Sequence, residues 1–261
     1  LNSVCNGKIL SETDFQNVWI HPNSGDGGSS MGAALYLYHA ILGQPRNYAL
    51  RSPYLGPGFS SAQVESFLKS QHITYHHFSS QSELLDQTAQ LIHSGKVVGW
   101  FQGRMEWGPR ALGARSILAN PCDPGIRDVL NLKVKHRESF RPFAPSVLRE
   151  HVAEWFELDG DSPYMLLVAG VRPERRIAPT AEQAKLFGIE RLNVPRSTIP
   201  AVTHVDYSAR IQTVYADTNP RYHALLSRFH ALTGCPVVVN TSFNVRGEPD
   251  RKSTRLNSSH T

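Results

Sequence analysis

Residues 96–149 read KVVGWFQGRMEWGPRALGARSILANPCDPGIRDVLNLKVKHRESFRPFAPSVLR. A short apolar run at residues 97–101 predicts a buried strand, and the glycines and prolines that follow it predict a loop. Nine basic residues occur from residue 104 to residue 149, against four acidic ones. Because the arginines alternate with glycine, proline and small residues, we expect several to point into one concavity, where guanidinium groups suit phosphate or carboxylate oxygens. The alternative is a basic surface that pairs with acidic residues elsewhere.

The composition is that of a soluble globular chain. It has 261 residues, 40% of them hydrophobic and 19% charged, which is enough for one large domain or two smaller ones. A net charge of +5 favours an anionic partner but does not choose between a nucleotide, a phosphate ester and a nucleic acid. The three cysteines are widely separated, which indicates a reducing cytoplasm. No apolar run approaches the roughly 18 residues of a membrane span, and the first residues do not have the basic-then-apolar pattern that is expected of a leader.

A glycine-rich turn stands near the beginning of the chain. Residues 17–22 predict a short strand, residues 25–28 read GDGG, and an apolar helix is expected to run to about residue 42. A helix start after such a turn suits a phosphate group, and Asp26 suits a metal or a hydroxyl. The alternative is an ordinary tight turn.

Two helices with capping signals follow a linker at residues 43–60. Ser60-x-x-Gln63 predicts a helix to about residue 71, and Ser80-x-x-Glu83 predicts a second helix that ends at Gly95. A strand is expected at residues 73–78 between them. The predicted core stripe of the second helix consists of Leu84, Leu85, Thr88, Leu91 and Ile92. Helix and strand thus alternate, as in an α/β domain.

The last third of the chain predicts more strands and one long helix. Strands are expected at residues 143–148, 164–171, 201–205, 210–215 and 236–239. Residues 172–200 are polar and without period, which indicates a mobile excursion or lid. Residues 220–233 predict a helix that carries Leu225, Leu226, Phe229 and Leu232 on one side.

A polar cluster, Asn240, Thr241, Ser242 and Asn244, follows the last predicted strand. The carboxyl end of a buried strand is where open α/β sheets bind ligands, whereas the alternative is a turn whose side chains bond their own backbone. His204, two residues before Asp206, is expected near these strand ends and in contact with substrate. Residues 251–261 are almost without apolar side chains, so we expect them to be disordered or foreign to the natural protein.

The chain resembles the C-terminal, YrdC-like domain of the O-carbamoyltransferases of nodulation-factor and antibiotic biosynthesis in four blocks: WFQGRMEWGPRALGARSILANP, LNLKVKHRESFRPFAPSVL, AVTHVDYSARIQTV and VVVNTSFNVRGEP. The block HPNSGDGGSSMGAALYLY resembles the end of that family's N-terminal domain. The resemblance implies an α/β fold, with a YrdC-like twisted mixed sheet and flanking helices, preceded by the tail of an actin/sugar-kinase-like domain. The expected boundaries are 1–42 for that tail, 43–60 for the linker, 61–250 for the YrdC-like domain and 251–261 for the terminal segment. We expect a truncated piece of a longer enzyme.

The resemblance also implies a reaction in two steps. ATP and carbamoyl phosphate form carbamoyl adenylate, and the carbamoyl group then moves to a hydroxyl of a small-molecule acceptor. The implied catalytic residues are Lys135, Arg141 and Ser242. The expected substrate- and nucleotide-binding residues are Arg110, Arg137, His204, Arg210, Asn240 and Asn244. Asp26 matches one ligand of a divalent metal, Fe or Mg, whose histidine-bearing motif is absent from this chain, so the ligand set is incomplete. We therefore expect no transfer to an acceptor by this chain alone.

Two other functions fit part of the pattern. A basic chain with a concave domain also suits a nucleic-acid-binding module, but the basic stretch lacks the interleaved aromatic residues of such modules. A threonylcarbamoyl-AMP synthase that modifies tRNA has the same domain type. The GDGG block favours the O-carbamoyltransferase arrangement, without a nucleic-acid partner or a membrane.

Overall fold

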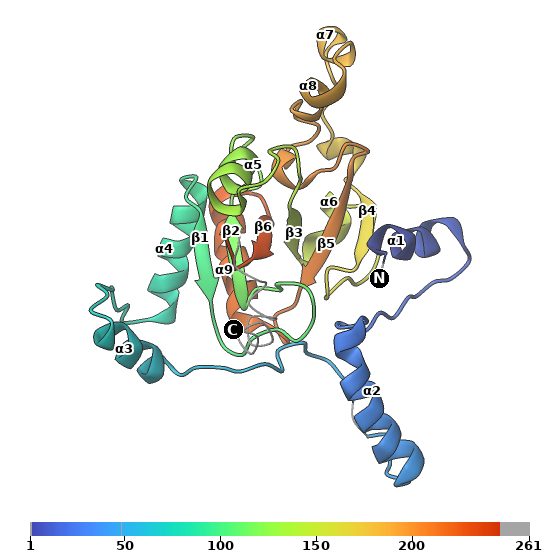
Figure 1. The fold of residues 1–261 in the computed structure, drawn as a ribbon. Coiled ribbons are helices and arrows are strands. Elements are labelled where there is room, and N and C mark those ends of the chain that lie inside the picture. Colours follow the sequence, from blue (N-terminus) through green and yellow to red (C-terminus); the bar gives the residue numbers. More distant parts are fainter. Residues whose placement is uncertain (1, 48, 246–261) are drawn as a thin grey trace.

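A mixed sheet of six strands forms the centre of the protein (Figure 1), as seen in a computed structural model that describes residues 2–47 and 49–245. The strands lie in the order β1-β2-β6-β3-β5-β4. Every neighbouring pair is antiparallel except β3 and β5, which are parallel. The bounds are β1 Val98–Phe101, β2 Arg115–Ala119, β3 Ala144–Leu148, β4 Leu167–Gly170, β5 Ser208–Val214 and β6 Val237–Ser242. The prediction of an α/β fold with a mixed sheet and flanking helices is confirmed.

The helices that flank the sheet include the two longest in the described chain. The α-helices are α1 Ser3–Glu12, α2 Ser29–Tyr36, α3 Ser61–Ser70, α4 Gln81–His93, α5 Ile126–Asp128, α6 Val152–Trp155, α7 Ala181–Ala184, α8 Gly188–Leu192 and α9 Pro220–Thr233. Two π-helical turns, η2 Leu37–Ile41 and η3 Val129–Lys135, continue α2 and α5. Short 3-10 turns are η1 Asp26–Gly28, η4 Arg149–His151, η5 Pro173–Arg175 and η6 Pro200–Val202.

The core lies between the sheet and the helix pair α4 and α9, which pack against each other. The apolar run at the start of β6 is covered on both faces of the sheet, because Val237, Val238 and Val239 are all fully buried and successive side chains of a strand point to opposite faces. Leu225 and Phe229 of α9 are fully buried as well. Apolar burial of this kind is the main term that stabilises the fold.

Three predicted strands are wrong. Residues 17–22 and 73–78 have no strand partner among the described residues, and the side chain of Trp19 is 71% exposed. Residues 201–205 lie instead at the 3-10 turn η6, which begins at Pro200. Ala201 and Val202 are fully buried there, so their apolar character reflects core packing and not strand pairing.

The predicted core-facing residues of α4 and α9 include two errors. Leu91 and Leu232 are 41% and 38% exposed, and the small residue Ala89 takes the inner position on α4 instead. The strand predicted at residues 236–239 is longer than expected, since β6 continues through Ser242 and includes the first three residues of the polar cluster.

Two segments project from the sheet in Figure 1. The hairpin that carries α7 and α8 extends from one end, and α2 extends from the other. No residue of α2 or η2 is buried against the rest of the described chain. The kinase-like origin of residues 1–42 and the mobility of residues 172–200 stay predictions. The predicted terminal segment, residues 251–261, lies outside the described residues.

The same serine cap begins two helices that differ in burial. Ser80 Oγ accepts the Glu83 N–H at 3.2 Å, and Ser60 Oγ accepts the Gln63 N–H at 3.2 Å. Because α4 packs into the core and α3 buries no residue, Ser80→Ala is expected to lower the free energy of unfolding by about 1 kcal/mol. Ser60→Ala is expected to leave it unchanged. Urea denaturation monitored by tryptophan fluorescence measures both, and equal losses would contradict the assignment of α3 to the periphery.

Candidate functional site

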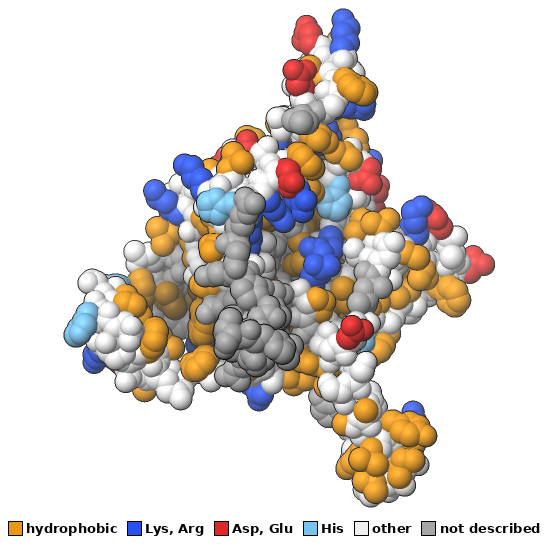
Figure 2. All heavy atoms as spheres, viewed as in Figure 1, with side chains coloured by type: hydrophobic (Ala, Val, Ile, Leu, Met, Phe, Trp, Pro, Cys, Tyr) orange, Lys and Arg blue, Asp and Glu red, His pale blue; other side chains and the backbone are white. Residues whose placement is uncertain are grey.

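Three arginines from separate parts of the chain meet at one place. Arg110 lies in the loop between β1 and β2, Arg137 follows η3, and Arg210 lies on β5. Burial, together with the nearby charges of Arg110 and Arg137, lowers the pKa of Arg210 to about 10. We call these three residues the arginine cluster. Lys and Arg side chains gather near the middle of the face shown in Figure 2.

Two members of the arginine cluster carry charges that no ion pair within the described residues neutralises. Among the described residues, neither Arg137 nor Arg210 forms an ion pair with a carboxylate. Burial also lowers the pKa of Arg137, and the charge of Arg141 adds to this effect. The like charges of Arg137 and Arg210 are costly to bury, so the arrangement suits an anion.

Lys135 joins the end of η3 to the end of β6. Its Nζ donates to the backbone oxygens of Ser242 at 2.6 Å and Asn244 at 2.7 Å. It also lies 2.9 Å from Asn244 Oδ1 and 3.3 Å from Ser242 Oγ. The structure therefore brings together three of the predicted site residues, and the ammonium group holds the turn after β6.

Two further predicted site residues differ in exposure: Arg141 is exposed and Asn240 is buried. The Nε of Arg141 pairs with Glu138 Oε2 at 2.9 Å, and its side chain is 53% exposed. Asn240 is 1% exposed, and its Nδ2 donates to Ala111 O at 3.0 Å and Gln212 Oε1 at 2.8 Å. Asn240 thus holds the loop that carries Arg110 through the backbone of Ala111. A role of Asn240 in binding stays a prediction.

His204 lies next to the arginine cluster. Burial lowers the pKa of the His204 imidazole, the charge of Asp206 opposes this shift, and the charge of Arg210 adds to it. Its Nδ1 is 2.9 Å from Ser208 Oγ. The imidazole is therefore expected to be neutral at pH 7, so it can offer a hydrogen bond to a ligand but no charge.

Glu106 is a residue of this region that the sequence analysis did not select. Its Oε1 accepts the N–H groups of Leu112 at 2.7 Å, Ala114 at 2.8 Å and Arg115 at 3.2 Å, and the residue is 1% exposed. A buried carboxylate with three backbone donors fixes the loop that follows Arg110. The available signal was its isolation, because Glu106 is the single acid in residues 102–122.

Two arginines of the basic stretch have a structural role. Arg104 donates to the backbone oxygens of Leu55 at 2.7 Å and Gly56 at 2.9 Å. Arg115 is 4% exposed and donates to Gln102 O at 2.7 Å and Gly103 O at 3.1 Å. These guanidinium groups hold the expected linker and the β1–β2 loop in place.

Asp26 does not meet other metal-binding side chains. It is exposed at the first position of η1, and the described residues contain no group of three His, Cys, Asp or Glu side chains that could hold a metal ion. The residues present therefore do not fit the expected metal site.

A separate cavity of about 1000 Å³ lies between α1 and β4. It is lined by Asp159, Asp161 and Asp206, among others, and by none of the arginine cluster. None of the described helices has the length and apolar character needed to cross a membrane.

Comparison with known families and proteins identifies the chain's relatives. The family model "Carbamoyltransferase C-terminus" matches residues 89–256, and "Carbamoyltransferase N-terminus" matches residues 1–35. An "Uncharacterized protein" of Synechocystis sp. is 55% identical over 95% of this chain and 41% of its own length. The nodulation protein NolNO of Sinorhizobium fredii is 37% identical over 95% of this chain and 34% of its own. The 3'-hydroxymethylcephem-O-carbamoyltransferase of Amycolatopsis lactamdurans is 36% identical over 90% and 39%. The chain thus spans about two fifths of the length of these relatives.

Proposed function

Because this chain belongs to the carbamoyltransferase family, we propose that it binds ATP and carbamoyl phosphate, forms carbamoyl adenylate, and serves the transfer of the carbamoyl group to a small-molecule hydroxyl. The observation that carries the proposal is the arginine cluster, since both substrates are polyanions. The name of one relative, 3'-hydroxymethylcephem-O-carbamoyltransferase, includes a hydroxymethyl group, which supports a hydroxyl acceptor.

The proposed first step consumes water and releases two products. Water takes the phosphoryl group of carbamoyl phosphate, so that orthophosphate leaves and carbamate remains. A carbamate oxygen then attacks the α-phosphorus of ATP, and the bond to pyrophosphate breaks. Catalysis of such steps depends mostly on positioning and on cations that neutralise charge in the transition state.

We assign a different role in this step to each group of side chains at the site. Arg110, Arg137 and Arg210 bind the phosphate oxygens and neutralise their charge. Lys135 holds the turn at Ser242 and Asn244 against the end of η3. The neutral imidazole of His204 offers a hydrogen bond beside Arg210 without adding a further positive charge.

Isothermal titration calorimetry of the 261-residue chain with ATP, carbamoyl phosphate and pyrophosphate tests the proposal. We expect saturable binding of each ligand, competition between ATP and pyrophosphate, and a mild dependence on salt. A steep loss of affinity with salt, together with tighter binding of RNA than of ATP, would instead indicate a nucleic-acid-binding module. Absence of binding by all three ligands would contradict the proposal.

A further inference from the structure

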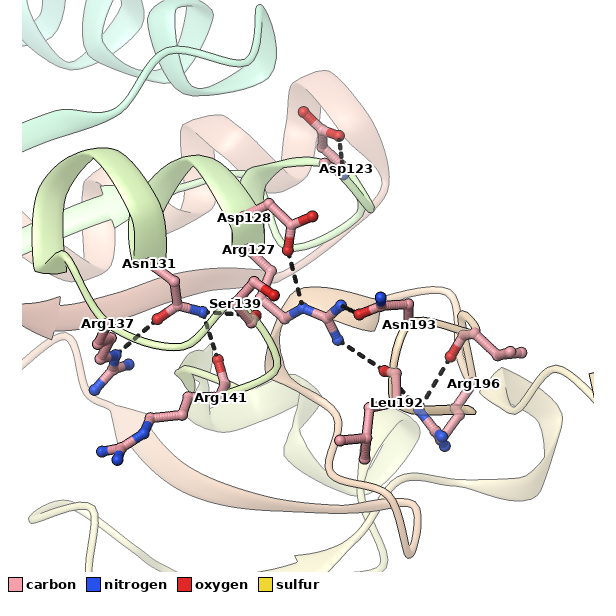
Figure 3. A network of polar contacts seen from close by, with 12 residues as sticks. Asp123, Arg127, Asp128, Asn131, Arg137, Ser139, Arg141, Leu192, Asn193 and Arg196 are labelled. Atoms are coloured by element: carbon pink, nitrogen blue, oxygen red, sulfur yellow. Dashed lines mark hydrogen bonds and ion pairs between the residues drawn. The ribbon is translucent and has the colours of Figure 1, made fainter. Parts of the chain in front are cut away.

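Asn131 is a fully buried amide beside the arginine cluster. It is 0% exposed and lies within the π-helical turn η3 (Figure 3). Its Nδ2 donates to the backbone oxygens of Ser139 at 3.0 Å and Arg141 at 2.8 Å. Its Oδ1 accepts the Nε–H of Arg137 at 2.7 Å. All polar atoms of the amide are therefore used, and the two carbonyl acceptors fix which side of the amide carries the nitrogen.

Asn131 also contacts Arg137 through the backbone. The Arg137 N–H donates to Asn131 O at 2.9 Å, across His136, whose φ of 46° lies in the left-handed region. Asn131 thus holds both the main chain and the side chain of Arg137. The guanidinium carbon lies 4.9 Å from the centre of the Phe143 ring, which packs against one side of it.

This arrangement leaves the outer edge of the guanidinium group for a ligand. Within the described part of the chain, the terminal nitrogens of Arg137 have no hydrogen-bond partner, because its side-chain hydrogen bond uses Nε. Two parallel N–H groups at this edge match two oxygens of one phosphate. Asn131 thus occupies the Nε side of the Arg137 guanidinium group and leaves its two terminal nitrogens to a ligand.

A neutral acceptor suits this position better than a carboxylate. Arg137 is near the like charges of Arg210 and Arg141, which favour its rotation into solvent. A carboxylate in place of Asn131 would hold Arg137 but would cancel its charge. An amide oxygen holds the Arg137 side chain without neutralising it, so the positive charge stays available to attract an anionic ligand.

We infer that Asn131 is a positioning residue of the anion site, which orients the Arg137 guanidinium group for phosphate oxygens. This inference rests on the proposed function and extends it to a side chain that the sequence analysis did not select. Asn131 itself does not touch the ligand.

The test is a double-mutant cycle on the full chain, with ATP and pyrophosphate as the probes in calorimetry. Asn131→Ala and Arg137→Ala are each expected to weaken binding by roughly tenfold or more, the usual effect of one charge-assisted hydrogen bond. The double variant is expected to bind no more weakly than Arg137→Ala alone, since Asn131 acts through Arg137. Asn131→Ser, made in parallel, provides the same comparison if the alanine variant does not fold.

Asn219→Ala is the matched control. Asn219 is also a buried amide, 5% exposed, and it donates to Tyr54 Oη at 2.6 Å. We expect this variant to lose stability in urea denaturation but to keep its affinity for ATP. If Asn131 had only a structural role, the losses of affinity caused by Asn131→Ala and Arg137→Ala would add up in the double variant. That result would overturn the inference. Wild-type chain that binds neither probe would overturn the proposed function as well.

Discussion

Arg210→Met is expected to abolish measurable binding of ATP and pyrophosphate and, at the same time, to make the unliganded protein more stable. The pKa of Arg210 falls well below its usual value, to about 10, chiefly through burial and then through the charges of Arg110 and Arg137. Each pKa unit corresponds to about 1.4 kcal/mol, so keeping this group charged at pH 7 costs the folded state on the order of 3 kcal/mol. Methionine removes the cost and fills much of the same space.

The measurements are urea denaturation without ligand and calorimetry with ATP. We expect the free energy of unfolding to rise by about 1–3 kcal/mol at pH 7. Arg228→Met is the matched control, because Arg228 lies on α9 and pairs with Asp86 at 3.3 Å on the surface. That variant is expected to change stability by less than about 1 kcal/mol and to bind ATP normally. A loss of stability in Arg210→Met would show that the guanidinium group is a structural residue.

Lys135→Met is expected to weaken ATP binding and to lower stability, the opposite sign to Arg210→Met. Removal of Nζ leaves the backbone oxygens of Ser242 and Asn244 without the charge that joins them to η3. A hydrogen bond to a charged group contributes about 1.5–3 kcal/mol, and we expect the free energy of unfolding to fall by that amount. The affinity for ATP is expected to fall by a similar free energy, because the turn after β6 is no longer held.

Lys133→Met separates this effect from a general loss of positive charge. Lys133 is exposed on the same π-helical turn, and its replacement is expected to alter neither quantity by more than about 0.5 kcal/mol. Unchanged stability together with weaker binding in Lys135→Met would mean that the ammonium group serves the ligand and not the turn.

Features with local causes were predictable from the sequence. The two serine caps stand where the residue pattern placed them, since a cap depends on residues three positions apart. Helix α9 has the predicted bounds, Pro220–Thr233, because proline begins it and Gly234 ends it with φ 71°. The strand at residues 73–78 was wrong because a strand also needs a neighbour, which local pattern does not reveal.

The presence of many cationic residues in one stretch was predictable from the sequence, but the contact that each of them makes was not. Lys135 and Arg137 are two positions apart, yet one contacts the turn after β6 and the other contacts Asn131. The π-helical turn η3 and the left-handed His136 produce this divergence, and neither has a clear sequence signal. Arg104 and Arg115 were counted with the cationic residues, but their partners are backbone carbonyls, which every residue carries.

Three guanidinium groups held close together in a half-buried place also attract anions smaller than ATP. In the proposed reaction, orthophosphate is released at the same arginines that recognise carbamoyl phosphate. Under this proposal the product would compete with the next substrate molecule, and the turnover rate would depend on the phosphate concentration of the surroundings. Phosphate and sulfate buffers would raise the apparent dissociation constant of ATP for the same reason, whereas bulky organic buffers would not.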